Sequence, residues 1–295
     1  MKFFLLALLL CCALAVSAQS QDRPLKVTLL GTGVPDPDPD RFGASILVQT
    51  PDANLLFDVG RGAVTRLKQA GVSADHIRAV FLTHLHYDHF ASLPDLLLTA
   101  WLFGRTTPLP VYGPPGSLSM TAALTKAFSA DVASRSLPAE GAQFRTSEIH
   151  EGLVYEQGAL RVTAFLVDHR QLKPAFGYRI DYHNRSVIVS GDTRYSANLV
   201  KFAKGADVVM HAAWLPDAKN PAPPEKRGIA SAEDAARVFA EIKPRLGVIY
   251  HYLAPEGIAD AVRRIYPGRV VVADDLTTIT VTDKDVLLQH PKSKD

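Results

Sequence analysis

Short apolar runs alternate with helical patterns along almost the whole chain. In the first half, runs rich in Val, Ile, Leu and Phe predict strands at residues 26–30, 45–49, 54–57, 78–82 and 109–112. Apolar residues at three- and four-residue spacing predict helices at residues 62–70, 94–103 and 117–128. Strands and helices therefore follow one another in succession rather than in separate blocks.

The second half of the chain repeats this alternation. It predicts strands at residues 160–167, 176–182, 186–189, 208–210, 247–250 and 269–272. Ser231, followed by Asp234, is typical of an N-cap and predicts a helix that ends at Ile242. Because both halves hold strands with helices between them, we expect an α/β fold in which two sheets pack face to face under helices. No internal repeat stands out, which favours one domain over residues 19–295.

The first 18 residues have the three parts of a signal peptide. Lys2 gives a positive start, residues 3–16 are apolar, and Val16-Ser17-Ala18 is a small-residue cleavage site. The apolar run is shorter than the ~20 residues that span a bilayer, which disfavours a membrane anchor. We therefore expect a secreted or periplasmic protein. Both cysteines, Cys11 and Cys12, lie in this segment, so the mature chain has no thiolate chemistry; a lipid anchor through one of them is the alternative.

The composition is that of a globular domain with a sizeable core. Hydrophobic residues make up 47% of the chain and charged residues 21%. The formal net charge is +2, which gives no electrostatic argument for nucleic acid or for an anionic membrane as a partner. We therefore expect neither partner once the signal segment has been removed.

The segment His84-Leu85-His86-Tyr87-Asp88-His89 is the strongest chemical signal. It follows a predicted strand, opens a predicted helix and places four ligand-type residues within six positions. Residues two apart on an extended chain point the same way, so His84 and His86 can hold one ion together. Where the chain turns, Asp88 and His89 point elsewhere and can serve a second ion. Imidazole and carboxylate suit zinc, manganese or iron.

Ligand-type residues also follow three other predicted strands. His169, Asp192 and His251 each come directly after an apolar run. The ends of such strands can meet at one sheet edge, where the active sites of α/β proteins usually lie. Each residue alone is more often an ordinary polar residue than a ligand, but the ordered set favours convergence on the first motif.

The first motif resembles the His-x-His-x-Asp-His signature of the metallo-β-lactamase superfamily. Further segments are similar to that family's motifs and occur in its order: residues 29–33 (opening strand and turn), 57–60 (structural Asp), 167–169 with 176–179 (third ligand), 190–193 (bridging Asp) and 249–251 (last ligand). The resemblance covers essentially the whole mature chain and is best with the ribonuclease Z-like and arylsulfatase-like branch. It implies the four-layer αββα metallo-β-lactamase sandwich.

The resemblance also implies a set of metal ligands. Two divalent ions would be held by seven side chains: His84, His86 and His169 on one ion, Asp88, His89 and His251 on the other, and Asp192 between them. Zinc is the first choice of metal, with manganese or iron as alternatives. Asp58 would orient a ligand histidine rather than bind a metal itself.

The implied activity is metal-dependent hydrolysis. Two ions can hold a hydroxide at neutral pH and clamp the attacking and leaving oxygens, which would cleave an ester-type bond in a phosphodiester, sulfate ester, carboxylic ester or lactone. Asp88 is a candidate to orient the hydroxide or accept its proton. His211, at the end of another predicted strand, is a candidate to contact the leaving group, with a structural role as the alternative.

Two positions depart from the nuclease relatives in this branch. Those relatives carry Glu after the histidine that matches His211, where this chain has Ala212, and His before a Ser or Thr, where this chain has Ile229-Ala230-Ser231. The interval from Tyr178 to Asp192 is also too short for a tRNA-binding arm. These departures favour a small-molecule ester with an activated leaving group over nucleic acid.

Several alternatives stay open. One is a ribonuclease Z-like nuclease, and another is a non-catalytic metal-binding protein of the same fold. The full ligand set argues against the second, because a structural site usually closes with four ligands. We expect little β-lactam hydrolysis. A homodimer is open, as are a lid role for the Pro-rich residues 216–224 and a pocket lining of aromatic side chains that includes Trp101, Phe103, Tyr112 and Trp214.

Overall fold

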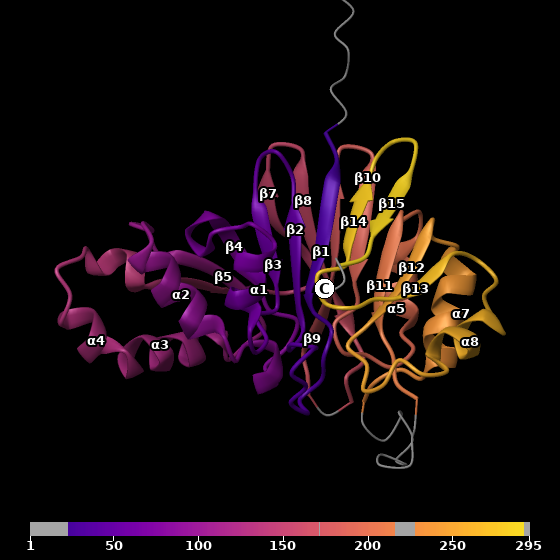
Figure 1. Cartoon of the computed structure of the whole chain (residues 1–295), viewed down its shortest axis with the longest axis horizontal. Coiled ribbons are helices and arrows are strands. Elements are labelled where there is room, and N and C mark those ends of the chain that lie inside the picture. Colours follow the sequence, from indigo (N-terminus) through magenta and orange to yellow (C-terminus); the bar gives the residue numbers. More distant parts are fainter. Residues whose placement is uncertain (1–22, 171, 216–227, 292–295) are drawn as a thin grey trace, which may run out of the picture.

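The computed structural model describes residues 23–170, 172–215 and 228–291 (Figure 1). The predicted signal peptide (residues 1–18) and the Pro-rich lid candidate (residues 216–224) lie outside the described residues. In the described part of the chain, no helix is long and apolar enough to cross a membrane.

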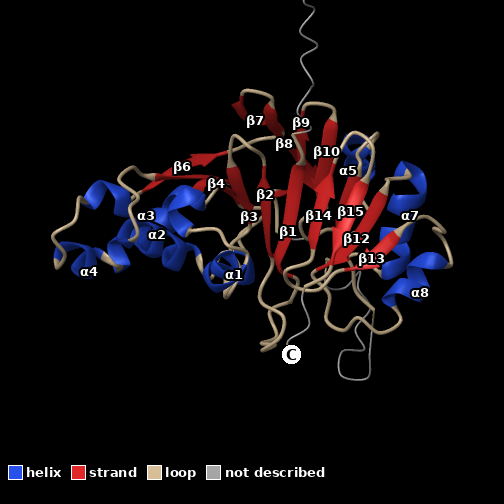
Figure 2. Cartoon of the chain, turned by 45° about the horizontal axis from the view of Figure 1, so that its top comes forward, coloured by secondary structure: helices blue, strands red, loops and turns tan. Residues whose placement is uncertain are grey.

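Two sheets form the centre of the described molecule (Figure 2). The strands of the first are β1 (Leu25–Gly31), β2 (Ser45–Gln49), β3 (Asn54–Phe57), β4 (Ile77–Phe81), β5 (Leu109–Gly113), β6 (Phe144–Glu148), β14 (Thr278–Val281) and β15 (Val286–Gln289). Those of the second are β7 (Gly152–Gln157), β8 (Leu160–Val167), β9 (Ala175–Tyr182), β10 (Arg185–Val189), β11 (Val208–Ala212), β12 (Leu246–Tyr250) and β13 (Val270–Val272). The spatial orders are β15-β14-β1-β2-β3-β4-β5-β6 and β13-β12-β11-β10-β9-β8-β7.

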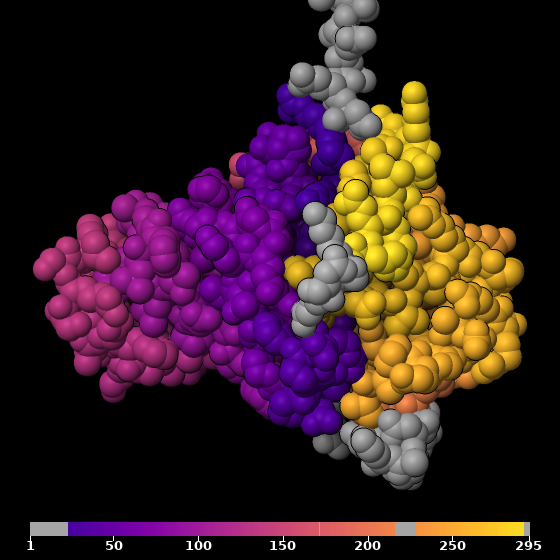
Figure 3. All heavy atoms as spheres, viewed as in Figure 1, coloured from indigo at the N-terminus to yellow at the C-terminus, as the bar shows by residue number. Residues whose placement is uncertain are grey.

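Helices cover the outer face of each sheet. On the first sheet these are α1 (Ala63–Gln69) and α2 (Leu93–Leu102), while α3 (Ser117–Ala127) packs beside β6 and α4 (Ser129–Ala133) lies beyond it. On the second sheet they are α5 (Ala197–Ala203), α7 (Ala232–Ile242) and α8 (Ile258–Arg263). The segment from α2 to α4 forms one side of the molecule and the C-terminal segment the other (Figure 3).

The buried side chains lie in three layers that follow from this arrangement. Between the two sheets, the rings of Phe57, Phe81 and Tyr178 pack together with centroids 4.9 to 5.7 Å apart. A second layer joins the first sheet to α1 and α2, and a third joins the second sheet to α5, α7 and α8. Burial of apolar surface between the layers supplies the main driving force for this fold. The predicted four-layer αββα sandwich is confirmed.

The strands run in directions that place the C-terminal ends of β4, β8, β10 and β12 at one edge of the sandwich. In the first sheet, β3, β4 and β5 run parallel. In the second, β10, β11 and β12 run parallel, and β8 shares their direction because two antiparallel pairings separate it from β10. The loops that follow β4, β8, β10 and β12 carry the ligand-type residues singled out from the sequence. The predicted convergence therefore involves two sheets rather than one.

The predicted strands and helices occur within about two residues of their expected bounds. The sequence analysis missed strands β6, β7, β14 and β15, and short helices α4, α5 and α8. The prediction that the histidine motif opens a helix directly is wrong, because Tyr87–His89 form a single 3-10 turn and α2 begins only at Leu93. Pro94 stands in the first turn of α2, where its missing N–H costs no helical hydrogen bond. If a single helix began at the histidine motif, Pro94 would lie in its interior and one backbone hydrogen bond would be lost.

A buried ion pair fixes the loop between β1 and β2 to the rest of the fold. The carboxylate of Asp275 accepts hydrogen bonds from the Thr32 backbone N–H at 2.8 Å and the Phe42 N–H at 2.8 Å. Arg66 of α1 donates to the same carboxylate through Nε at 3.0 Å, and its guanidinium lies 4.3 Å from the Phe42 ring centroid. Burial raises the pKa of Asp275, and the hydrogen bonds from Phe42 and Thr32 and the positive charge of Arg66 act against that rise.

Replacing Asp275 with Ala should destabilise the fold by about 3–5 kcal/mol, because it leaves the buried Arg66 charge without its partner. Chemical denaturation of Asp275→Ala and of the double variant Arg66→Met/Asp275→Ala measures this. The double variant should lose less than the single one. A double variant that is less stable than Asp275→Ala would contradict this account of the pair.

Candidate metal centre

Three histidines from two sheets form the first half of the cluster. His84 and His86 follow β4, and His169 follows β8. His86 Nδ1 lies 3.1 Å from His84 Nε2 and 3.1 Å from His169 Nε2. The three side chains are close enough together to serve one metal ion. His86 therefore faces this point through Nδ1, whereas the other two face it through Nε2.

Asp88, His89 and His251 form the second half of the cluster. Asp88 Oδ2 lies 3.6 Å from His89 Nε2 and 3.8 Å from His251 Nε2. Asp88 and His89 come from the 3-10 turn after the first two histidines, and His251 follows β12. These three side chains are also close enough to serve one ion.

Asp192, after β10, lies against both halves. Its Oδ1 is 3.3 Å from His251 Nε2 and 3.6 Å from His89 Nε2. It also groups with His84 and His89, with all ligand atoms within 4.8 Å of one another. The structure thus brings together all seven residues that the resemblance assigned to metal binding.

Asp58 orients two members of the cluster from outside it. Its Oδ2 accepts hydrogen bonds from His89 Nδ1 at 2.7 Å and from Thr83 Oγ1 at 2.8 Å, and its Oδ1 accepts from the Thr83 backbone N–H at 2.8 Å. Because the Thr83 hydroxyl gives its hydrogen to Asp58, it accepts one from His84 Nδ1 at 2.9 Å. Both histidines are thereby left with a free Nε2 that faces the cluster.

Backbone carbonyls orient the other two buried histidines. His169 Nδ1 donates to the Gly228 carbonyl at 2.7 Å, and His251 Nδ1 donates to the Gly33 carbonyl at 2.7 Å. In each ring the hydrogen is fixed on Nδ1, so Nε2 carries the lone pair that a metal needs.

In the absence of metal, the electrostatics of the cluster favour protons on two of its histidines, His89 and His251. Burial lowers the pKa of His89, but the carboxylates of Asp58 and Asp192 outweigh it and raise that pKa to about 10. Burial also lowers the pKa of His251, and Asp192 again raises it. Burial raises the pKa of Asp192, whereas His251 and His89 hold it well below its usual range. The carboxylates therefore require positive charge here, which a divalent cation supplies when it displaces those protons.

Two buried atoms of the cluster make no hydrogen bond with any described residue. They are His89 Nε2 and Asp192 Oδ1, which face each other at 3.6 Å. Burial of such atoms without partners is costly, and both are ligand atoms for the metals that imidazole and carboxylate suit. Burial together with the positive charge of His89 also lowers the pKa of His84, which favours the neutral form that binds metal. The residues present therefore fit divalent metal ions.

His211 lies apart from this cluster. It is on β11, and its neighbours Val209 and Ala213 on the same face pack into the layer beneath α7. Its ring is 6.3 Å from that of Phe239, and its Nδ1 donates to the Ala212 carbonyl at 2.6 Å. Burial lowers the pKa of His211. It is not among the residues that line the cavity at the cluster, so its position gives no support to the predicted contact with a leaving group.

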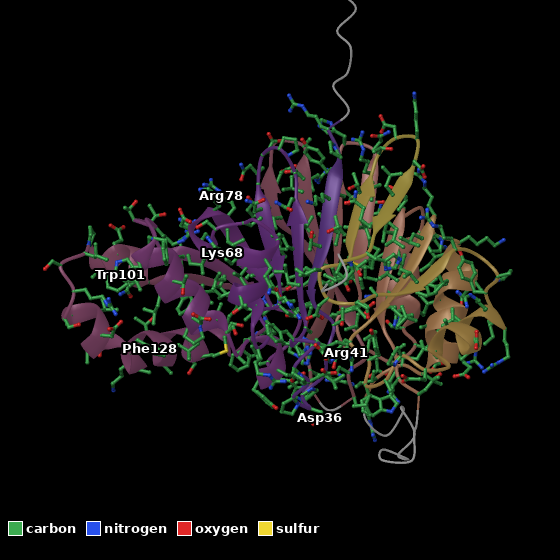
Figure 4. All side chains as sticks on the ribbon, viewed as in Figure 1. Asp36, Arg41, Lys68, Arg78, Trp101 and Phe128 are labelled. Carbon is green, nitrogen blue, oxygen red and sulfur yellow. The ribbon has the colours of Figure 1, made fainter. Side chains whose placement is uncertain are left out.

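A cavity of about 390 Å³ opens onto the cluster and exposes His86, Asp88, His169 and Asp192. The rest of its wall is formed by Val34, Pro35, Asp36, Trp214, Ile229 and Leu253. Of these six residues, the sequence predicted only Trp214 to line a pocket. The other aromatic candidates, Trp101, Phe103 and Tyr112, are not among them, and Figure 4 places Trp101 far from Asp36. The wall residues stand in the loops after β1, β11 and β12 and before α7, so the positions of these loops could have indicated it.

Comparisons with known sequences agree with the geometry. Residues 53–252 match the β-lactamase superfamily domain. Ribonuclease Z from Mycobacterium sp. (strain KMS) is 35% identical over 275 residues, which cover 87% of this chain and 96% of the relative. Ribonuclease Z from Mycobacterium bovis (strain BCG / Pasteur 1173P2) is 35% identical over 277 residues, covering 87% of this chain and 98% of the relative.

Solved structures lead to the same family. The metallo-β-lactamase fold protein YhfI from Bacillus subtilis superposes with a TM-score of 0.73 at 20% identity, covering 88% of this chain and all of its own. The short form of human tRNase Z superposes with a TM-score of 0.68 at 26% identity, covering 86% of this chain and 98% of its own. The chain therefore belongs to the β-lactamase superfamily and is a hydrolase with the metallo-β-lactamase fold, as the sequence resemblance predicted.

Proposed function

We propose that this protein is a metal-dependent phosphodiesterase that cleaves RNA, in the manner of a ribonuclease Z. The observation that carries the proposal is the meeting of His84, His86, Asp88, His89, His169, Asp192 and His251 at one cavity. The 35% identity to ribonucleases Z over almost their whole length supports RNA as the substrate. The name of the human structural relative makes tRNA the first RNA to test.

This proposal corrects the substrate predicted from the sequence. The prediction of a small-molecule ester, with nucleic acid disfavoured, is wrong in view of the ribonuclease Z relatives. It relied partly on the net charge of +2, which is a sum over the whole surface. Charges more than about 8–10 Å apart are screened from each other, so such a sum does not describe the face that an RNA contacts.

The prediction that no tRNA-binding arm is inserted between Tyr178 and Asp192 is confirmed. Strands β9 and β10 pair as a hairpin and are joined directly through His183 and Asn184. RNA contacts in this protein would therefore have to come from other parts of its surface.

We assign the metals as the resemblance implied: His84, His86 and His169 would hold one ion, Asp88, His89 and His251 a second, and Asp192 would contact both. When bound, two divalent ions lower the pKa of water and offset the negative charge of the phosphodiester. Zinc suits this set of imidazoles and carboxylates, with manganese or iron as alternatives.

The side chains of the cluster have separate tasks in this proposal. Asp58 and the carbonyls of Gly33 and Gly228 keep the imidazoles in the tautomer that binds metal. Asp88 both faces the histidines and lines the cavity, so its carboxylate can accept a proton from the attacking water. No role in the reaction is assigned to His211.

The leaving group would meet an apolar wall. Trp214, Ile229 and Leu253 line the same cavity as the cluster, and Ala212 and Ala230, which are close to Trp214 and Ile229 in sequence, are fully buried. Trp214 has an indole N–H, which donates a hydrogen bond but is not an acid, and the other four side chains are apolar. Protonation of the leaving group would then depend on Asp36, on solvent or on the proton taken up by Asp88.

Replacing the bridging carboxylate tests the proposed function. Asp192→Asn should lower cleavage of an unprocessed tRNA by more than about 100-fold, beyond the 10–100-fold typical of contacts outside the ligand set. Chelator treatment of the wild type should have the same effect, and added zinc should reverse it. Asp131→Asn, an exposed carboxylate on α4, is the control. Chelator-resistant cleavage, or no cleavage of any RNA by metal-loaded protein, would contradict the proposal.

Replacing Asp58 tests the orientation of the histidines. Asp58→Asn places an amide N–H₂ where His89 or Thr83 now donates, so metal affinity should fall by about 10–100-fold. Asp207→Asn is the matched control, because Asp207 also accepts a backbone hydrogen bond, from Ser186, but is remote in sequence from every ligand. Competition with a chromophoric chelator measures the affinities. Equal metal affinity in both variants and the wild type would refute the role of Asp58.

The apolar wall predicts a strong dependence on the leaving group. Single-turnover cleavage of aryl phosphodiesters should slow steeply as the phenol becomes less acidic, because the wall residues Trp214, Ile229 and Leu253 supply no acid. Trp214→His would place a proton donor in this wall and should reduce that slope. A wild-type rate that does not change with the acidity of the phenol would show that a protein group already protonates the leaving oxygen.

A further inference from the structure

Arg41 joins two loops that meet beside the cluster. Its Nη1 donates to the Tyr252 carbonyl at 2.7 Å and its Nη2 donates to the Leu253 carbonyl at 2.5 Å. Its guanidinium also lies 4.5 Å from the centroid of the Tyr252 ring. These two carbonyls belong to the residues directly after His251, so one side chain holds the segment that carries this histidine. Figure 4 shows Arg41 close to Asp36 in the same loop region.

The backbone conformation of His251 requires contacts that keep it in place. His251 has a φ of 51°, in the left-handed region that non-glycine residues seldom adopt. Such a conformation is unfavourable and persists only where surrounding contacts fix it. Three contacts with the loop after β1 do so: His251 Nδ1 to the Gly33 carbonyl, the Tyr252 N–H to the Thr32 carbonyl at 3.3 Å, and the pair of bonds from Arg41.

Arg41 is itself held in place. Its Nε donates to Asp38 Oδ2 at 3.2 Å, and Asp38 Oδ1 accepts from the Asp40 backbone N–H at 2.9 Å. Only 14% of the Arg41 side chain is exposed. The adjacent Phe42 is bound to Asp275 through its backbone N–H. The guanidinium therefore belongs to a fixed frame rather than to a free surface side chain.

We propose that Arg41 is a positioning residue for the metal centre: by binding the carbonyls of Tyr252 and Leu253, it fixes His251 against Asp192 and Asp88. The inference rests on the proposed metal centre and adds a residue that touches neither metal nor substrate. Arg41 acts on one half of the cluster only, because it makes no contact with His84, His86 or His169, and other contacts orient His84 and His169. A guanidinium suits this task because its planar, pre-organised donors can serve two carbonyls at once.

This role predicts that loss of Arg41 changes the binding of the two ions unequally. Loss of Arg41 should weaken the ion assigned to Asp88, His89 and His251, and leave the ion assigned to the three other histidines in place. A purely structural role would instead lower the stability of the metal-free protein and weaken both ions together.

The test is a two-step zinc titration of the purified protein with a competing chelator, together with elemental analysis. Arg41→Gln should weaken one of two binding steps by about 10–100-fold and leave the other within about twofold. Arg41→Lys should recover only part of the loss, because a single ammonium does not reproduce the paired donors. Asp38→Asn, which frees Arg41 Nε but keeps both carbonyl bonds, should give a smaller effect than Arg41→Gln.

The matched control is Arg237→Gln, which removes an exposed arginine and its ion pair with Asp234 on α7. Its two binding steps should equal those of the wild type. Unchanged zinc binding by Arg41→Gln, or equal weakening of both steps, would overturn the role of Arg41. A wild type that binds no zinc, manganese or iron would instead remove the proposed metal centre itself, so the two failures can be told apart.

Discussion

The structure depends on how the negative charge of three buried carboxylates is compensated at one end of the sandwich. The carboxylates of Asp58, Asp88 and Asp192 are almost fully buried there, beside His89 and His251. Buried carboxylates are very costly unless positive charge faces them. Without metal, these carboxylates raise the pKa of both histidines and so favour their protonated forms. Two divalent cations would meet the same requirement and release those protons.

The rest of the fold serves to hold these groups at one point. Parallel strands from two sheets end at the same edge, so ligands far apart in sequence become neighbours. Contacts outside the cluster then fix each ring, from Asp58 to His89 and from Gly33 to His251. Arg41 extends this support to the backbone after His251. The buried pair of Arg66 and Asp275 anchors the loop on which Arg41 stands.

Much of this could be predicted from the sequence, because strong local patterns report local structure. The β-branched run before Asp192 and the spacing of His84 to His89 indicated strand ends and ligands. Strand β6 has one apolar residue, Phe144, followed by four polar ones, so its apolar pattern was too weak to be found. The cavity wall and the packing of His211 depend on which face of a strand meets α7, which a chain pattern does not reveal. The prediction of a small-molecule ester, which the ribonuclease Z relatives contradict, relied on single departures from a motif and on a net charge that averages over the surface.

The most direct test of the proposed dinuclear centre is anomalous scattering from a crystal of the zinc-loaded protein, measured on both sides of the zinc absorption edge. The proposal predicts two anomalous peaks about 3.5–4 Å apart. One peak should lie among His84, His86 and His169, the other among Asp88, His89 and His251, with Asp192 in contact with both. A single peak, or zinc bound anywhere else while the cluster stays without it, would contradict the account.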